Sequence, residues 1–204
     1  VMVSEKFPMS TGVIVPIKSM KQFEFMTSKF CCVFDVEITN IFAKSENENP
    51  ISVSKCFVKE NVSENNGRLV CAKKICMTIT EIDYKVFSQF YTWEKIRIGR
   101  MICYRKEYLP TEFVESILHL YEMKTKLKGV KGKELEYLNS KEMLNSCYGM
   151  CVTNPLRDEI LCDGKTWDIE HLTGEKQLEM LNKYNDSKNR FLFYPWGIYV
   201  TAYA

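Results

Sequence analysis

Apolar and polar residues alternate over residues 29–76, in a pattern that predicts β-strands. The segments are KFCCVFDVEI, NPISVSKCFVK and RLVCAKKIC, which are rich in Val, Ile, Phe and Cys. The stretches between them, SENENP and ENVSENNG, have the composition of turns and loops. Together they predict a meander of antiparallel strands.

The pattern changes at residue 80, where the sequence TEID is typical of a helix N-terminus. Ile82, Val86 and Phe90 then recur at every fourth position, as they would on one face of a short helix. The following segment, WEKIRIGRMICYR, alternates again and predicts another strand.

Two longer helices follow and predict an α-hairpin. Pro110 begins the first helix, and Gly129 and Gly132 mark its end. The second helix is expected from about residue 133 to 151. The expected apolar side of the first helix consists of Val114, Ile117, Leu118 and Tyr121. The lysines around the connection are Lys124, Lys126, Lys128, Lys131 and Lys133.

The two ends of the chain and the segment after the hairpin are less regular. Residues 154–193 are polar and broken, which predicts short hairpins or an inserted loop. The last segment, FLFYPWGIYVTAYA, is apolar and predicts a helix near Pro195 and Gly197. The chain starts at Val1 without a methionine and ends without a cap, so we expect it to be a piece of a longer protein.

Composition narrows the class of protein. The 204 residues are 46% hydrophobic, enough to bury the core of one large or two small domains. The net charge of +2 means that any basic surface must be local. Nine cysteines without a C-x-x-C pair predict reduced thiols rather than a zinc site. No apolar run approaches the roughly 20 residues that span a bilayer, and no secretion signal is present, so we expect neither a membrane protein nor a secreted one.

The nine residues KEMLNSCYG, from 141 to 149, carry the candidate chemistry. On a helix Lys141, Asn145 and Tyr148 share one stripe, while Met143, Cys147 and Met150 are expected to form an opposite, more apolar one. An ammonium group, an amide and a ring suit the phosphate, sugar and base of a nucleotide, and Gly149 would permit close approach. The same spacing also fits an ordinary solvated face, so these residues alone leave both interpretations open.

The segment resembles a known motif. KEMLNSCYG matches the K-x-x-x-N-S-x-Y-G pattern of family B DNA polymerases, called motif B, at five positions. The continuation MCVTNP resembles the protein-primed branch of that family, found in phages, adenoviruses and linear plasmids. The matching residues are Lys141, Asn145, Ser146, Tyr148 and Gly149.

The resemblance extends in order along most of the chain and implies an α+β fold. Residues 1–28 resemble the palm segment after motif A, and residues 29–104 the first terminal protein region. Residues 105–153 would form the fingers hairpin with motif B. Residues 154–192 occupy the place of the second terminal protein region, and residues 193–204 lead toward motif C.

This resemblance implies a DNA-directed DNA polymerase, with DNA template and primer, dNTP and a terminal protein as partners. In the family a primer 3′-hydroxyl or a terminal-protein hydroxyl attacks the dNTP, and Mg²⁺ is held by aspartates of motifs A and C. Neither D-x-x-S-x-Y-P nor D-T-D occurs in these 204 residues. We therefore expect no catalytic residue or metal ligand here and no polymerisation by this chain alone.

The resemblance also implies where the protein acts: in the cytoplasm of a phage-infected host, or in a mitochondrion if the protein comes from a linear plasmid. The alternative is a noncatalytic module that binds nucleotides or nucleic acid.

The resemblance also implies roles for single residues. Lys141 would contact the triphosphate, Asn145 the triphosphate or sugar, and Tyr148 the nascent base pair. Gly149 would let the template base lie close to the helix, while Ser146 would contact the nucleotide or serve packing.

A second triphosphate lysine is expected on the preceding helix. Lys124 is the first choice, with Lys126 and Lys128 as alternatives, and a third family position falls on Tyr137. We expect His119 and His171 to be structural or exposed. Asp35 and Glu37 are expected on the solvent face of a strand rather than at a metal.

Overall fold

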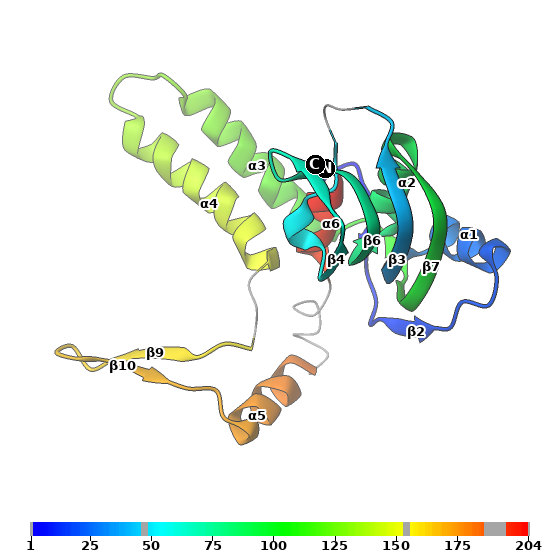
Figure 1. Ribbon diagram of the computed structural model, residues 1–204. Coiled ribbons are helices and arrows are strands. Elements are labelled where there is room, and N and C mark those ends of the chain that lie inside the picture. Colours follow the sequence, from blue (N-terminus) through cyan, green and yellow to red (C-terminus); the bar gives the residue numbers. More distant parts are fainter. Residues whose placement is uncertain (1, 46–48, 153–155, 186–194, 204) are drawn as a thin grey trace. The chain divides into compact units, whose positions relative to one another are not determined.

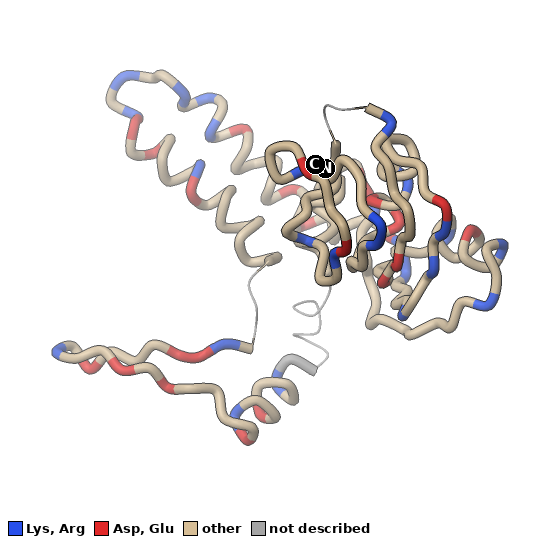
Figure 2. The backbone as a smooth tube through the Cα atoms, in the orientation of Figure 1, with Lys and Arg blue, Asp and Glu red and all other residues tan. Residues whose placement is uncertain are grey.

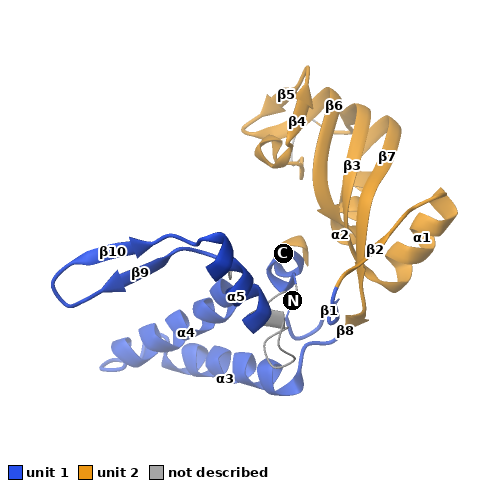
Figure 3. Ribbon diagram, turned by 90° about the horizontal axis from the view of Figure 1, so that it is seen from below, with its two compact units in different colours: residues 1–11, 108–200 blue, residues 12–107, 201–204 orange. Residues whose placement is uncertain are grey.

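The computed structural model describes residues 2–45, 49–152, 156–185 and 195–203, which form two compact units. The helical unit comprises residues 1–11 and 108–200, and the sheet unit comprises residues 12–107 and 201–204 (Figure 3). Both helices and antiparallel sheets are present, so the predicted α+β class is confirmed. No helix within the described residues is both long enough and apolar enough to cross a membrane.

The sheet unit is built on one antiparallel sheet. Its strand order is β2-β7-β3-β6-β4, with β5 also paired to β6 (Figure 1). The strands are β2 (Val13–Val15), β3 (Cys31–Ala43), β4 (Val58–Glu60), β5 (Ser63–Asn65), β6 (Arg68–Thr80) and β7 (Tyr91–Tyr104). The remaining elements of the unit are α1 (Met20–Lys29), a 3-10 turn η1 (Val53–Lys55), α2 (Glu81–Phe90) and β8 (Lys106–Glu107).

This topology differs from the predicted meander in two ways. The segment NPISVSKCFVK does not form one continuous strand. It contains the 3-10 turn η1, and only its last residues belong to a strand, the short β4. In addition β7 returns to pair with β3, so β3 lies between β6 and β7. Periodicity could identify the strands, but the strand neighbours depend on contacts between residues far apart in the sequence.

One face of the sheet is covered by α1 and α2. The rings of Phe23 on α1 and Phe34 on β3 meet edge to face at 5.1 Å, and Phe23 meets Tyr84 on α2 at the same distance. Phe23 and Phe34 are completely or almost completely buried. Such pairs add directional attraction to the burial of apolar surface, and they fix both helices against the sheet.

The opposite face is polar, as predicted for Asp35 and Glu37. Thr78 donates a hydrogen bond to Asp35 at 2.6 Å, and Lys74 pairs with Glu37 at 2.9 Å. Both carboxylates therefore lie on the solvent face of the sheet, each paired with a neighbouring side chain. Among the described residues no group of three His, Cys, Asp or Glu is placed to hold a metal.

The start of α2 is fixed by two arrangements. Thr80 and Asp83 form a capping box, which confirms the N-terminus predicted from the sequence TEID. Glu81 is fully buried, accepts the backbone N–H of Cys32 at 2.9 Å and pairs with Lys106 at 3.2 Å. This buried carboxylate thus joins the beginning of β3, the beginning of α2 and the end of the sheet unit.

The helical unit contains an α-hairpin, a β-hairpin and two further helices. Its elements are β1 (Phe7–Pro8), α3 (Thr111–Leu127), α4 (Glu134–Val152), β9 (Glu159–Cys162), β10 (Trp167–Glu170), α5 (Gly174–Asn185) and α6 (Trp196–Tyr203), the last continuing beyond the unit. The polar segment after the α-hairpin therefore contains the predicted short hairpin. Residues 154–155 and 186–193 of this segment lie outside the described residues.

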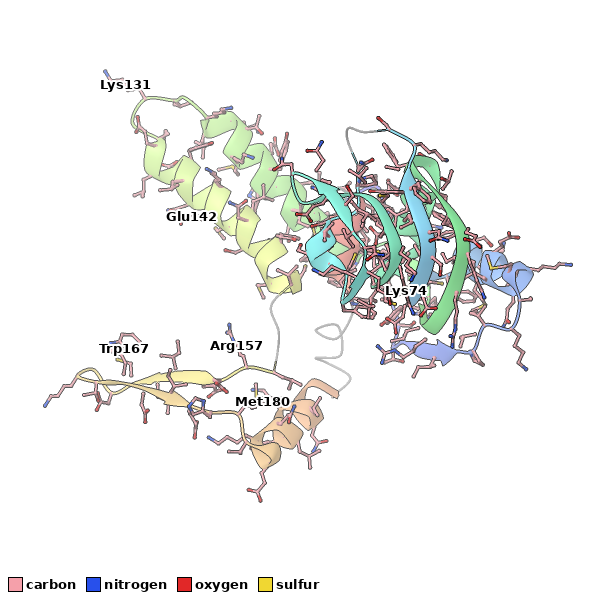
Figure 4. All side chains as sticks on the ribbon, in the orientation of Figure 1. Lys74, Lys131, Glu142, Arg157, Trp167 and Met180 are labelled. Carbon is pink, nitrogen blue, oxygen red and sulfur yellow. The ribbon has the colours of Figure 1, made fainter. Side chains whose placement is uncertain are left out.

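The β9–β10 hairpin is a two-stranded ribbon with unequal faces. Ile160 lies opposite Ile169, and Cys162 lies opposite Trp167, so these four side chains share one face. Trp167 is 77% exposed and projects from the ribbon (Figure 4). Because a lone two-stranded hairpin is only marginally stable in water, local polar contacts must contribute to its stability.

Asp158 makes such contacts at the base of the ribbon, so we predict that the stability of the β9–β10 hairpin depends on pH. It accepts the N–H of Leu172 at 2.7 Å and lies 3.0 Å from Nδ1 of the exposed His171. The Leu172 N–H, and then His171, lower the pKa of Asp158. Stabilisation from this carboxylate should be fully present above about pH 4, the ordinary aspartate pKa, and be lost as the pH falls through the lowered value. The chemical shift of the Trp167 indole N–H, followed against pH, should report this loss.

The control is Asp158→Asn, which should remove the transition without changing the fold of α3 and α4. A transition that persisted in this variant would belong to another carboxylate, such as Asp163 in the hairpin turn, and would contradict the assignment.

Candidate nucleotide-binding site

The connection between α3 and α4 is rich in lysine and ends α3 sharply (Figure 2). Gly129 and Gly132 have positive φ values of 77° and 80°, which confirms that they mark the end of the first helix. The Gly132 N–H donates to Glu134 at 3.1 Å at the start of α4. Lys131 lies at the tip of the connection (Figure 4). A short, well-defined loop thus brings the two helices together as antiparallel neighbours.

The face of α3 that packs differs from the predicted one. Val114 is half-buried and Ile117 is buried, as expected, but Leu118 and Tyr121 are 47% and 56% exposed. The packing line runs instead through the buried or half-buried residues Phe113, Ile117, Leu120, Met123 and Leu127. Relative to the prediction the helix is rotated, because a wide apolar surface allows more than one side to face the partner helix.

On α4 the packing line runs between the two predicted stripes. Its half-buried side chains are Tyr137, Ser140, Leu144, Cys147 and Cys151, and Gly149 is half-buried on the far side of the helix. Cys147 therefore contributes to packing, whereas Met143 and Met150 are 58% and 71% exposed. Met143, Cys147 and Met150 lie together on the other side of α4 from Lys141, as expected, but only Cys147 belongs to the packing side.

Lys141, Asn145 and Tyr148 lie together on one flank of α4. At about 100° per residue they lie roughly 60° to 120° around the helix from the packing line, all in the same sense. Lys141 and Asn145 are exposed, and Tyr148 is 40% exposed. Among the described residues the Lys141 side chain makes no hydrogen bond or ion pair. The structure therefore leaves this ammonium group available to an anion.

Lys124 lies on the same side of the hairpin as this flank. It lies about 40° from the packing line of α3 in the same sense as Lys141 on α4, whereas Lys126 lies about 120° in the other sense. Both helices are right-handed and antiparallel, so residues rotated in the same sense share one side of the hairpin. Lys124 also lies 5.4 Å from the ring centre of Tyr121, and Lys126 pairs with Glu122. Lys128, just beyond α3, is on the side of Lys124.

Ser146 and Gly149 lie farther around α4. The Ser146 hydroxyl donates to the Glu142 carbonyl at 2.8 Å, so it is engaged within its own helix. A Cβ added to Gly149 would meet no atom within 4 Å, so an alanine side chain has room at this position. Tyr137, in place of the third expected lysine, is half-buried on the packing line. His119 is exposed, and His171 contacts Asp158.

The C-terminal end of α4 packs against α6. Gly197 is buried, and a Cβ added to it would lie 2.8 Å from the Cys151 carbonyl oxygen and would clash with Val152. The ring of the adjacent Trp196 lies beside that of Phe113 of α3, tilted, with ring centres 5.7 Å apart, and its indole N–H donates to the Pro8 carbonyl at 2.9 Å. These contacts link both helices of the hairpin to α6.

Two glycine substitutions should therefore have opposite effects on stability. Gly197→Ala should destabilise the helical unit by about 1–3 kcal/mol, because the methyl group has no room. Gly149→Ala should stabilise α4 by roughly 0.5–1 kcal/mol, because alanine favours a helix interior and finds open space here. Urea unfolding of both variants measures the difference. Equal effects would show that α6 does not pack closely on α4.

No family model and no curated protein matches this sequence.

Solved structures of Phi29 DNA polymerase match the fold. The complex with primer-template DNA and incoming nucleotide substrates has a TM-score of 0.64 and 14% identity, over 100% of this chain and 32% of that one. The post-translocation complex with primer-template DNA gives 0.62 and 14% over 100% and 31%, and the orthorhombic crystal form 0.59 and 14% over 100% and 32%. The whole of this chain therefore shares its fold with about a third of Phi29 DNA polymerase.

Proposed function

We propose that this chain is the nucleotide-binding part of a protein-primed family B DNA polymerase. The observation that carries the proposal is the flank of α4, where Lys141, Asn145 and Tyr148 lie together and the Lys141 and Asn145 side chains are exposed. The motif match at the same residues and the fold shared with Phi29 DNA polymerase, solved with DNA and incoming nucleotides, support it.

The proposed roles follow from the chemistry of each group. The Lys141 ammonium group would neutralise charge on the triphosphate of an incoming dNTP, and the Asn145 amide would bond to the triphosphate or the sugar. The Tyr148 ring would contact the nascent base pair. Gly149 would keep the helix surface flat next to it. Ser146 is the least direct candidate, because its hydroxyl already bonds to the Glu142 carbonyl.

The proposal covers binding rather than the chemical step. In the complete reaction a DNA template, a primer and a terminal protein would take part, in the replication of viral or plasmid DNA. The described residues include no cluster that fits Mg²⁺. The sequence also lacks D-x-x-S-x-Y-P and D-T-D, so we propose that this chain alone does not transfer nucleotides. Template-directed incorporation by the purified chain would contradict this point.

A comparison of two lysines tests which side of the hairpin binds. Lys124→Ala should weaken binding of a fluorescent dATP analogue by roughly 10-fold or more, because a charge-assisted contact contributes about 1.5–3 kcal/mol. Lys126→Ala should leave the affinity within about twofold, since that lysine lies on the other side and pairs with Glu122. Fluorescence anisotropy of the purified chain gives both values.

The opposite order of effects would place the nucleotide on the other side of the hairpin. If DNA bound but dNTP did not, the noncatalytic nucleic-acid module would be the better interpretation.

A further inference from the structure

Two buried thiols face each other near one end of the β3–β7 strand pair. Cys32 on β3 lies directly opposite Cys103 on β7, and their Sγ atoms are 3.7 Å apart. The exposed fractions are 0% for Cys32 and 5% for Cys103. The proposed nucleotide site uses neither residue, and they are 71 positions apart in the sequence.

The backbone at this pair has the geometry that a disulfide needs. The N–H of Cys32 donates to Glu81 at 2.9 Å, on the side of β3 away from β7. In an antiparallel pair such a residue is not hydrogen-bonded to its direct neighbour, and the two Cα atoms lie about 4.5 Å apart with their side chains close. Disulfides span Cα distances of about 4.4–6.8 Å, so the bond can form without moving either strand far.

We propose that Cys32 and Cys103 form a cross-strand disulfide when hydrogen peroxide oxidises the protein. The Cys103 thiolate attacks one peroxide oxygen, which gives a sulfenic acid at Cys103 and releases hydroxide. The Cys32 sulfur then attacks the Cys103 sulfur, the S–O bond breaks, and the oxygen leaves as water. The balance is two thiols and one peroxide giving one disulfide and two waters.

The surroundings of the two sulfurs assign these roles. The contact with Cys32 lowers the pKa of Cys103, whereas the contact with Cys103 and burial raise the pKa of Cys32. Cys103 is therefore the better nucleophile toward peroxide, and it is also the more exposed of the two. Peroxide is little larger than water, so it can reach a sulfur that larger disulfide reagents cannot.

The neighbouring Cys31 provides a matched control. It is also fully buried on β3, but it lies opposite Tyr104 and its side chain points to the other face of the sheet. It should therefore not join the disulfide, although it is adjacent to Cys32 in the sequence.

The experiment treats the purified chain with hydrogen peroxide, blocks the remaining thiols with iodoacetamide and digests it without reduction. Mass spectrometry should find one linked peptide pair joining Cys32 to Cys103, removed by dithiothreitol. Because the bond closes a long loop, the Tm should rise by roughly 10 °C, reversibly on reduction. Cys31→Ser should retain both effects, and Cys32→Ser and Cys103→Ala should lose them.

Absence of the linked peptide in the oxidised wild-type chain would overturn the proposal, and this measurement depends on no variant. Oxidation that stopped at a sulfinic or sulfonic acid on Cys103, or a link through Cys31, would also overturn it.

Discussion

Replacing Lys141 with alanine should weaken binding of a fluorescent dATP analogue by roughly 10- to 100-fold, while binding of duplex DNA changes little. The expected size follows from the loss of a charge-assisted phosphate contact, worth about 1.5–3 kcal/mol. Since the Lys141 side chain makes no hydrogen bond or ion pair within the described residues, its removal should leave the stability of the chain nearly unchanged. Titrations with the wild-type chain and the variant measure the effect.

The ligand itself provides the control for Lys141. A deoxynucleoside without phosphates should bind the wild-type chain and the variant equally, because the proposed contact is to the triphosphate. An unchanged affinity for the triphosphate would reject Lys141 as its ligand. An equal loss for the nucleoside would mean that the substitution disturbs the flank as a whole.

Replacing Glu81 with alanine should destabilise the sheet unit by about 3 kcal/mol. The substitution leaves the Lys106 ammonium group and the Cys32 N–H without the buried carboxylate that both contact. Removing one partner of a buried pair is costly because the other remains partly desolvated. Urea unfolding followed by circular dichroism should show a lower midpoint at an unchanged slope. Glu81→Gln should fall between, because its amide oxygen can still accept the Cys32 N–H.

Glu37→Ala is the matched control on the same sheet. Glu37 pairs with Lys74 at 2.9 Å, but about a third of each side chain is exposed. Such a pair contributes about 0–1 kcal/mol, so the variant should remain close to the wild type in stability. A Glu81 variant no less stable than the Glu37 variant would show that the buried pair does not hold the sheet unit together.

Local features of the fold could be predicted from the sequence because their causes are local. The cap at Thr80 depends on a hydroxyl and a carboxylate three residues apart, and the end of α3 depends on glycines that accept positive φ. The stripe of Lys141, Asn145 and Tyr148 follows from helical spacing alone. In each case a few neighbouring residues contain the whole physical argument.

Other features depend on distant partners and could not be predicted in this way. The sequence does not determine which side of α3 faces α4, so the expected positions of Leu118 and Tyr121 are wrong. For the same reason sequence spacing alone does not tell which of Lys124 and Lys126 lies on the side of Lys141. That depends on how the two helices pack against each other. The position of β7 beside β3 could not be predicted from the sequence either, and nor could the Cys32–Cys103 pair that depends on it.

Little of the surface of α4 is buried, and this affects how any ligand binds to the helix. None of the nineteen residues of α4 is fully buried, whereas β3 and β6 carry most of the core of the sheet unit. A segment with so little buried surface opens at a smaller free energy than a core strand. A ligand that binds only the ordered helix shifts that opening equilibrium by mass action. Affinity for the ligand and persistence of the helix are then two measures of a single coupled equilibrium.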